Sequence, residues 1–476
     1  MGEVTNTLFP ITFNKSLKVE TRPEMLSSDG GAIVLREIDE RLKVTKTLAD
    51  NLSDPRDPNT ITYPLPELLR TRLYLIAQGW NDADDADCLR HDPAFVTAVS
   101  QQKGQTPLKP ENVNLRMHDG LPSQPTLSRL TEMLASDENR KTLRKTLIES
   151  ARKSIKAGRK HRYRYFTLDI DSLPIETYGH QEGSVFNGYY KHTCYHPLVA
   201  MLAETGDILD IKLRPGNVHS ADGLSDFLFP LIDEVEGKIG LVASVRGDAA
   251  MPNEDDLSEL ERRRTGYAFR IKSNDVLKRL AEPYLANITK GHFGERDEWT
   301  AELTYQAGSW SRPRRIVLVI VEQEQIDLFE PFNHFFLVTD WTEQQMSGFD
   351  VLDFYRQRGT MERLIGEFKD VLEPVLSCAS RQRNNTTENV RDDFACNEAL
   401  LLLYCLAYNL LNIARRLMEK ATGKGWSLRR FREQVLKTAV HFTLHSHRIW
   451  AWITRSSAEL WQLLGLRIIK LHPIPV

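Results

Sequence analysis

The spacing of hydrophobic residues divides the chain into parts of different period. From Gly31 to about residue 159 apolar residues recur every three to four positions, which predicts a helical N-terminal region behind a loosely held arm, residues 1–25. Near Tyr163 the period changes to two, which is typical of strands with one buried face. The change of period predicts a boundary between a helical part and a sheet.

Strand and helix patterns alternate after this boundary. Strands are predicted at 163–171, 194–202, 208–213, 239–245 and 267–272, and helices at 221–235 and 255–264. The dipeptide Asn187-Gly188 predicts a hairpin before the second strand. This order predicts an α/β fold in which a mixed sheet carries helices on its faces.

A second group of strand patterns interrupts the helices that follow. Strands are predicted at 299–305, 315–321 and 335–338, then helices from 344 to 417, around 428–440 and around 458–464. We therefore divide the chain into a helical N-terminal region with its arm (1–159), a sheet core in two parts (160–284 and 343–420), a β-rich insertion (285–342) and a helical C-terminal region (421–476).

Composition narrows the class of protein. Of the 476 residues, 41% are hydrophobic and 27% are charged, as in ordinary soluble proteins. The five cysteines show no paired spacing, which indicates free thiols in a reducing cytoplasm. The most apolar stretch, 399–417, contains Asn409 and Asn412 and predicts a buried helix rather than a membrane span. We find no signal-peptide pattern at the N-terminus. The sequence also has no GxxxxGK[ST] loop, so we expect no nucleotide cofactor.

Charge is unevenly distributed. The net charge of −3 does not favour a nucleic-acid partner, but eleven basic residues and the single acid Glu149 lie between Arg140 and Arg164. Such a stretch contacts DNA phosphates or forms a solvated helix face, and the sequence leaves both interpretations open.

The most specific pattern is Y-x2-R-x3-E-x6-K, formed by Tyr355, Arg358, Glu362 and Lys369. In one uninterrupted helix these four side chains lie within about 60° of one another and share a face. Gly359 and Gly366 lie beside them, which leaves room for a DNA backbone, and Glu367 points elsewhere. A charged solvent face explains the charges but not the two glycines.

Two further carboxylates follow strands. Asp171 ends the first strand of the core, Asp169 lies two residues earlier on the same face, and Asp248 follows the strand at 239–245. Sites in α/β sheets form at strand ends, although a single Asp there is more often a turn or cap residue.

Three carboxylates suit metal-dependent phosphoryl transfer. Two divalent ions roughly 3.5–4 Å apart activate an attacking oxygen and stabilise a leaving one. Magnesium prefers carboxylate oxygens, so Asp171, Asp248 and Glu362 are our candidate metal ligands, with Mg2+ as cofactor and Mn2+ as a substitute. Tyr355, Arg358 and Lys369 would then hold a DNA phosphate. The alternating His192, Cys194 and His196 look more like packing than a zinc site.

These residues resemble the DDE transposases of bacterial insertion sequences. The resemblance extends from about residue 28 to 450 and includes LPELLRTRLYLIAQGWNDADDADCLRHDPAF, SQPTLSRL, DIDS, QEGSVFNGYYKHTCYHPL, VRGD and AYNLLNIARR. It implies an RNase H-like core with a β-rich insertion before the catalytic glutamate, and a catalytic triad of Asp171, Asp248 and Glu362, with Asp169 as the alternative for the first position.

The resemblance also implies a role for the insertion. Members of this group often cut through a DNA hairpin and stack an aromatic ring on a flipped base, for which Trp310 is the first candidate and Trp299 the second. Both also fit a hairpin core. One departure is Ala249-Ala250-Met251 after Asp248, where the family pattern has a Ser-Gly-aromatic run.

The sequence thus predicts a cytoplasmic, nucleoid-associated transposase. It would bind terminal inverted repeats in double-stranded DNA as a homodimer, cleave at the element ends as an endonuclease and join the 3′-hydroxyls to target DNA, with no membrane partner. One alternative is a non-mobile RNase H-like nuclease, which would cut DNA without joining ends. The other is a catalytically inactive, transposase-derived DNA-binding protein, which would bind repeats without cutting.

Overall fold

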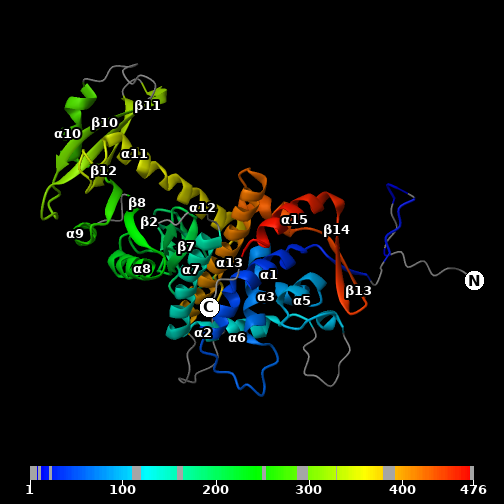
Figure 1. The fold of residues 1–476 in the computed structure, drawn as a ribbon. Coiled ribbons are helices and arrows are strands. Elements are labelled where there is room, and N and C mark those ends of the chain that lie inside the picture. Colours follow the sequence, from blue (N-terminus) through cyan, green and yellow to red (C-terminus); the bar gives the residue numbers. More distant parts are fainter. Residues whose placement is uncertain are drawn as a thin grey trace, which may run out of the picture.

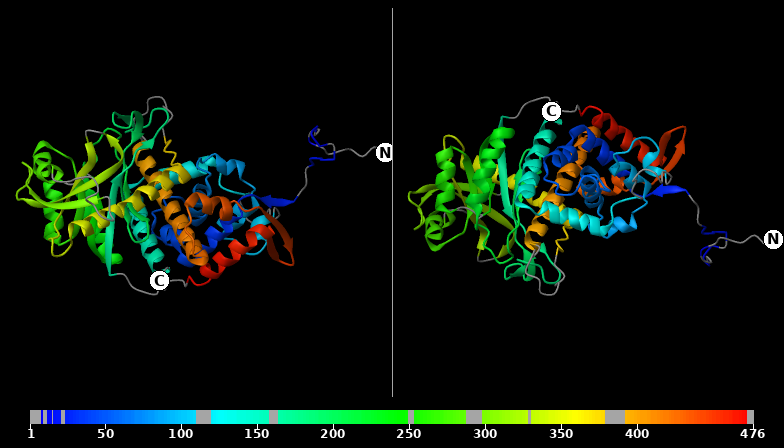
Figure 2. Two further views of the ribbon diagram at one scale, coloured as in Figure 1. Left: turned by 90° about the horizontal axis from the view of Figure 1, so that it is seen from above. Right: turned by 90° about the horizontal axis from the view of Figure 1, so that it is seen from below.

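A computed structural model describes residues 8, 12–14, 16–20, 24–109, 120–157, 164–248, 253–286, 298–327, 330–378 and 392–471. Figure 1 shows a sheet with its helices at one end of the molecule and a helical body at the other. The two further views in Figure 2 show the same division, with the long helix α13 (Asp393–Thr422) running through the body.

An eight-stranded sheet forms the core. Its strands lie in the order β10-β11-β12-β9-β8-β2-β6-β7. Their bounds are β2 Tyr165–Ser172, β6 Leu198–Leu202, β7 Asp207–Lys212, β8 Leu241–Gly247, β9 Gly266–Ile271, β10 Glu298–Tyr305, β11 Arg314–Asp327 and β12 Glu330–Thr339. Strands β2, β6 and β7 pair antiparallel, whereas β8 and β9 run parallel to β2. This order and these directions are those of an RNase H-like core, so the predicted fold class is confirmed.

The strands predicted for the insertion continue this sheet. Strand β12 pairs antiparallel with β9, and β11 and β10 follow outward. Before them the structure places helix α10 (Asp275–Ala286), which the hydrophobic pattern did not predict. The added strands therefore share one continuous sheet with the core.

Helices cover both faces of the sheet. On one face Phe166, Leu168 and Ile170 of β2 belong to a core shared with α8 (Leu224–Lys238), α9 (Glu254–Arg263) and α10. The other face packs against α11 (Gly348–Arg356), α12 (Arg358–Leu372) and α13. Because side chains alternate along a strand, Asp169 and Asp171 lie on this second face.

The N-terminal helices pack around α13. They are α1 Gly31–Leu42, α2 Val44–Asn51, α3 Leu65–Gln78, α4 Asp85–Cys88, α5 Pro93–Val99, η1 Thr106–Leu108, α6 Gln124–Leu134 and α7 Asp137–Ala157. Helix α13 is long and apolar enough to cross a membrane, but 94% of its most apolar window is buried inside the protein. The prediction of a buried helix over 399–417 is confirmed.

Local breaks explain where predicted strands differ. The strand predicted at 194–202 is two strands, β5 (His192–Tyr195) and β6, because Pro197 lacks the N–H that a continuous ladder needs. Strand β5 joins β3 (Ile175–Glu176) and β4 (Val185–Asn187) in a small sheet. The hairpin predicted at Asn187-Gly188 is present between β4 and β5.

The C-terminal region differs most from its prediction. Instead of a helix over 428–440, the structure has α14 (Leu428–Phe431) and a π-helical turn η2 (Arg432–Leu436). A hairpin of β13 (Val440–His445) and β14 (Arg448–Ile453) follows, then α15 (Arg455–Ile468). Strand β13 pairs with β1 (Met25–Ser27), more than 400 residues away, so no local pattern could reveal this sheet.

Candidate active site

The sheet brings Asp171 and Asp248 to one edge. Strands β2 and β8 are parallel neighbours, and their last paired residues are Ile170 and Gly247. Asp171 and Asp248 each follow by one residue, so the two carboxylates leave adjacent strand ends in the same register. Both influence Tyr190, whose pKa is raised by burial and then by Asp171 and Asp248.

Asp169 has a different environment. Both of its oxygens accept hydrogen bonds from Arg246, from Nε at 2.6 Å and from Nη2 at 2.8 Å, and both side chains are only 2% exposed. A carboxylate fully engaged with a buried guanidinium holds the fold together. This arrangement favours Asp171 over Asp169 as the first candidate metal ligand.

The predicted single helix from Tyr355 to Lys369 is interrupted. Helix α11 ends at Arg356 and α12 begins at Arg358, so Tyr355 lies on the first helix and the other three residues on the second. The Phe354 carbonyl, which would accept from the Arg358 N–H in a continuous helix, accepts from Arg246 Nη1 at 2.7 Å. Arg246 also donates to Gln357 Oε1 at 3.2 Å, so this buried side chain fixes the junction.

Arg358 links the two sides of the site. Its Nη2 donates to Asp171 Oδ2 at 2.7 Å, and its Nη1 donates to Glu362 one turn further along α12. The Arg358 side chain is 8% exposed, whereas that of Glu362 is 57% exposed. The guanidinium therefore lies between a buried carboxylate and one that faces solvent.

Electrostatics at Asp171 follow from this crowding. Burial raises the pKa of Asp171 to about 6, Arg358 opposes the rise, and Asp248 and Glu362 add to it. Burial also raises the pKa of Tyr355, which is influenced by Arg358, Asp248 and Glu362. Asp171, Asp248, Glu362, Arg358 and Tyr355 thus form one electrostatically coupled group.

The donor set is chemically suited to a hard divalent ion. Asp171, Asp248 and Glu362 offer only carboxylate oxygens, which magnesium prefers. Within the described ranges, no three His, Cys, Asp or Glu side chains lie close enough to hold a metal ion together. At Asp171 and Glu362 the positive charge is supplied by Arg358.

Lys369 is the remaining residue of the Y-R-E-K pattern. Lys369 lies three residues before the end of α12, near enough to Cys194 to lower the thiol pKa that burial raises. A Cβ placed on Gly359 or Gly366 would meet no atom within 4 Å among the described residues, so both glycines border open space. This is consistent with the predicted room for a DNA backbone.

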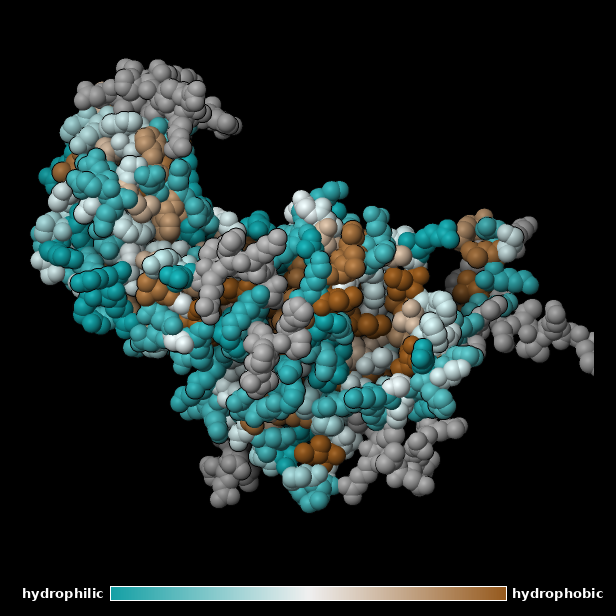
Figure 3. Space-filling model, viewed as in Figure 1, coloured by the Kyte–Doolittle hydropathy of each residue, from teal (hydrophilic) through white to brown (hydrophobic). Residues whose placement is uncertain are grey.

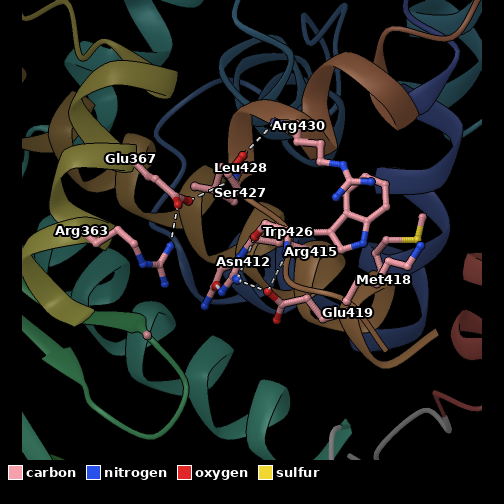
Figure 4. A network of polar contacts seen from close by, with 12 residues as sticks. Arg363, Glu367, Asn412, Arg415, Met418, Glu419, Trp426, Ser427, Leu428 and Arg430 are labelled. Atoms are coloured by element: carbon pink, nitrogen blue, oxygen red, sulfur yellow. Dashed lines mark hydrogen bonds and ion pairs between the residues drawn. The ribbon is translucent and has the colours of Figure 1, made fainter. Parts of the chain in front are cut away.

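Glu367 belongs to a network that attaches α12 to the C-terminal region (Figure 4). It accepts from Arg363 at 2.6 Å and from the Leu428 N–H at 3.0 Å. Nearby, the Arg430 guanidinium lies 4.1 Å from the ring centre of Trp426. These contacts show Glu367 in a structural role, away from Asp171 and Asp248.

The insertion places Trp310 at a shallow cavity of about 370 Å³. Trp310 packs edge-on against Tyr305 and lies under Arg314, so one part of the ring is used in packing. The cavity is also lined by His219 and Asn253, and Ser220, next to His219, bonds Ser172 beside Asp171 at 3.1 Å. Trp299 packs against Tyr284 instead.

The basic stretch at 140–164 is divided between internal contacts and the surface. Arg140 and Arg144 pair with Glu398 of α13, and Arg144 also pairs with Asp210. Lys153 is buried and donates to Thr47 Oγ1 at 3.1 Å. Lys141 and Lys145 are exposed, and residues 158–163 lie outside the described ranges. Arg140 and Arg144 therefore hold α7 against α13, while Lys156 and Arg164 join Lys141 and Lys145 at the surface.

The sequence patterns do not single out two residues of the site, Arg246 and Tyr190. In the sequence Arg246 is visible only as part of VRGD, and Tyr190 only as part of the NGYYKH run. An arginine inside an apolar strand is a signal that could have found the first, because a buried guanidinium needs an acidic partner. The segment Ala249-Ala250-Met251 lies outside the described residues.

Comparisons with known proteins assign the class. The chain matches the family "Transposase DDE domain group 1" over residues 9–465, and it therefore belongs to this family of DDE transposases. No curated protein matches the chain. Among solved structures, it is similar to a piggyBac transposase in its synaptic complex with hairpin DNA, at 13% identity and a TM-score of 0.40, covering 94% of this chain and 86% of that one.

Proposed function

We propose that this chain is an active DNA transposase whose metal ligands are Asp171, Asp248 and Glu362. The observation that carries the proposal is the register of β2 and β8, which sets Asp171 beside Asp248 at one sheet edge, with α12 bringing Arg358 and Glu362 to the same face. Family membership supports a DNA-cutting and DNA-joining enzyme over a nuclease of another class.

The three carboxylates would bind divalent metal, with Mg2+ as the cofactor and Mn2+ as a substitute. The bound ions would activate the attacking oxygen and stabilise the leaving one. Arg358 donates to Asp171 and Glu362, and metal binding by these carboxylates would release its planar fork to hold a phosphate. Lys369 adds a positive charge on the same helix. Tyr355, beside Arg358, would fix the position of that phosphate.

Trp310 would bind a base removed from the duplex near the cut. The cavity beside it, of about 370 Å³, has room for a nucleobase, and its polar lining includes Asn253 and Lys272. An aromatic ring stacks on any base, so this contact would position DNA without reading its sequence.

The DNA partners of the enzyme would be the terminal inverted repeats of its element and a target duplex. It would act in the cytoplasm, at the nucleoid, as a homodimer that pairs two ends. The helical N-terminal region (1–159) and the C-terminal region (421–476) would bind the repeats, and the core in its two parts (160–284 and 343–420) with the insertion (285–342) would carry the chemistry.

The proposal is tested by incubating purified protein and Mg2+ with a labelled duplex that carries the element's own terminal repeat. We expect cleavage at the repeat boundary and joined products with wild type, and loss of both in Glu362→Gln. The matched control is Asp370→Asn, an exposed carboxylate on the same helix, which should cleave normally. Firm repeat binding without cleavage by wild type would indicate an inactive DNA-binding protein, and cleavage without joining would indicate a nuclease.

A further inference from the structure

The hairpin β13–β14 presents an unusual outer face. Its inner face packs on the body through Phe442 and Ile453, together with Met25 and Ile33. The strand register places His441 opposite Trp452 and Thr443 opposite Trp450 on the outer face. Trp450 is 44% exposed and Trp452 is 56% exposed. Two large aromatic rings therefore face solvent where a surface strand normally carries polar side chains.

The two indoles stack on each other and form one aromatic platform. Their ring planes are 17° apart with centroids at 5.8 Å, and Trp452 Nε1 donates to Thr443 Oγ1 at 2.9 Å. This hydrogen bond satisfies the polar edge of Trp452 and holds its ring against the sheet. The exposed ring faces are left as stacking surfaces.

The surroundings of this platform are positively charged. Arg448 and Arg455 are exposed at the two ends of β14, and residues 440–455 contain no aspartate or glutamate, in a chain whose net charge is −3. Lys437, just before the hairpin, is paired with Asp29 and adds no free charge to this face. Arg448 lies at the tip of the hairpin, opposite His445. Aromatic rings beside a cationic, acid-poor surface match the bases and phosphates of a nucleic acid.

The tip of the hairpin is held in a strained turn. Ser446 and His447 have φ of 48° and 61°, in the left-handed region that a tight hairpin turn requires and that glycine or asparagine normally occupies. Gln105 Nε2 donates to the Arg448 carbonyl at 3.3 Å and supports this turn from the N-terminal region. Strain of this kind persists where a particular presentation of side chains is needed.

We propose that the outer face of β13–β14, with Trp450 and Trp452 as its platform, binds unpaired DNA bases. Inside a duplex each base already stacks on its neighbours, so the indole pair should bind unpaired bases in preference to paired ones. Figure 1 places this hairpin at the end of the molecule opposite the insertion, and Figure 2 agrees. The platform thus holds a strand away from the candidate cutting site. The inference rests on the proposed function, because it takes DNA as the ligand.

The test measures binding of a fluorescein-labelled twelve-base oligothymidylate and of a duplex of equal length, by fluorescence anisotropy in EDTA so that no strand is cut. We expect Trp450→Ala and Trp452→Ala each to weaken single-strand binding about fivefold or more. The double variant Trp450→Tyr, Trp452→Tyr should bind within about threefold of wild type, because tyrosine still stacks. The control Tyr165→Ala, an exposed aromatic on β2, should bind normally.

The outcomes separate the possible partners. If the double variant Trp450→Ala, Trp452→Ala keeps its thermal unfolding midpoint and binds the oligothymidylate as wild type does, the inference is wrong. If sedimentation shows that the double variant loses self-association while single-strand affinity is unchanged, the face is an interface between copies, and the inference is also wrong. Failure of wild type to cut the repeat would overturn the proposed function and leave this binding result standing, because the assay contains no metal.

Discussion

Removing Arg246 should destabilise the fold and disturb the site together. Arg246 makes two hydrogen bonds to Asp169, one to the Phe354 carbonyl and one to Gln357, and its guanidinium lies 4.8 Å from the Phe354 ring centre. The variant Arg246→Met leaves the Asp169 carboxylate buried without its cation. Breaking a buried pair in this way costs about 3–5 kcal/mol of the free energy of unfolding.

A double-mutant cycle separates this cost from ordinary packing. In the Asp169→Asn background, Arg246→Met leaves no buried carboxylate without its cation. It should therefore cost only about 1–3 kcal/mol there, the loss of the hydrogen bonds to the Phe354 carbonyl and Gln357. Urea unfolding followed by far-ultraviolet circular dichroism measures both differences. Equal costs of Arg246→Met in the two backgrounds would refute the view that the Asp169–Arg246 pair is what Arg246 stabilises.

Two further predictions concern the site itself. Burial raises the pKa of Asp171 to about 6, and a protonated carboxyl cannot bind a metal ion. The affinity for Mg2+ should therefore be full above about pH 7 and fall about tenfold for each pH unit below 6. Calorimetry from pH 5 to 8 measures this affinity, and a flat profile would count against Asp171 as a ligand. Gly366 borders open space, so Gly366→Ala should stabilise α12 by about 1 kcal/mol in urea unfolding. The added methyl group should also weaken repeat binding. Unchanged DNA affinity would mean that the DNA backbone does not approach Gly366.

The strands and the carboxylates at their ends could be predicted because the information is local. The period-two pattern of β2, the apolar run of β8 and the aspartates that follow them are visible within ten residues of sequence. Parallel strand ends meet at one edge of a sheet, so the proximity of Asp171 and Asp248 follows from the fold class. The position of the Y-R-E-K residues beside these aspartates follows less directly from the sequence, because α12 reaches the site through packing against the sheet.

Features set by distant partners could not be predicted. Continuous helix-forming residues surround Gln357, but the junction of α11 and α12 is fixed by Arg246, more than a hundred residues earlier. Arg140 and Arg144 read as part of a basic surface because their partner Glu398 lies more than 250 residues away. The β13–β14 hairpin was missed for the same reason, since β1 comes from the other end of the chain.

The central claim, that Asp171, Asp248 and Glu362 bind the catalytic metal, is tested most directly by changing each to cysteine. A thiolate is a poor ligand for Mg2+ and a better one for the softer Mn2+. We expect each variant to lose repeat cleavage in Mg2+ and to recover it in Mn2+, while Asp370→Cys, on the exposed side of α12, cleaves in both. Wild-type cleavage by a variant in Mg2+ would contradict the assignment of that residue, and loss of cleavage in both metals by all three variants would contradict direct ligation.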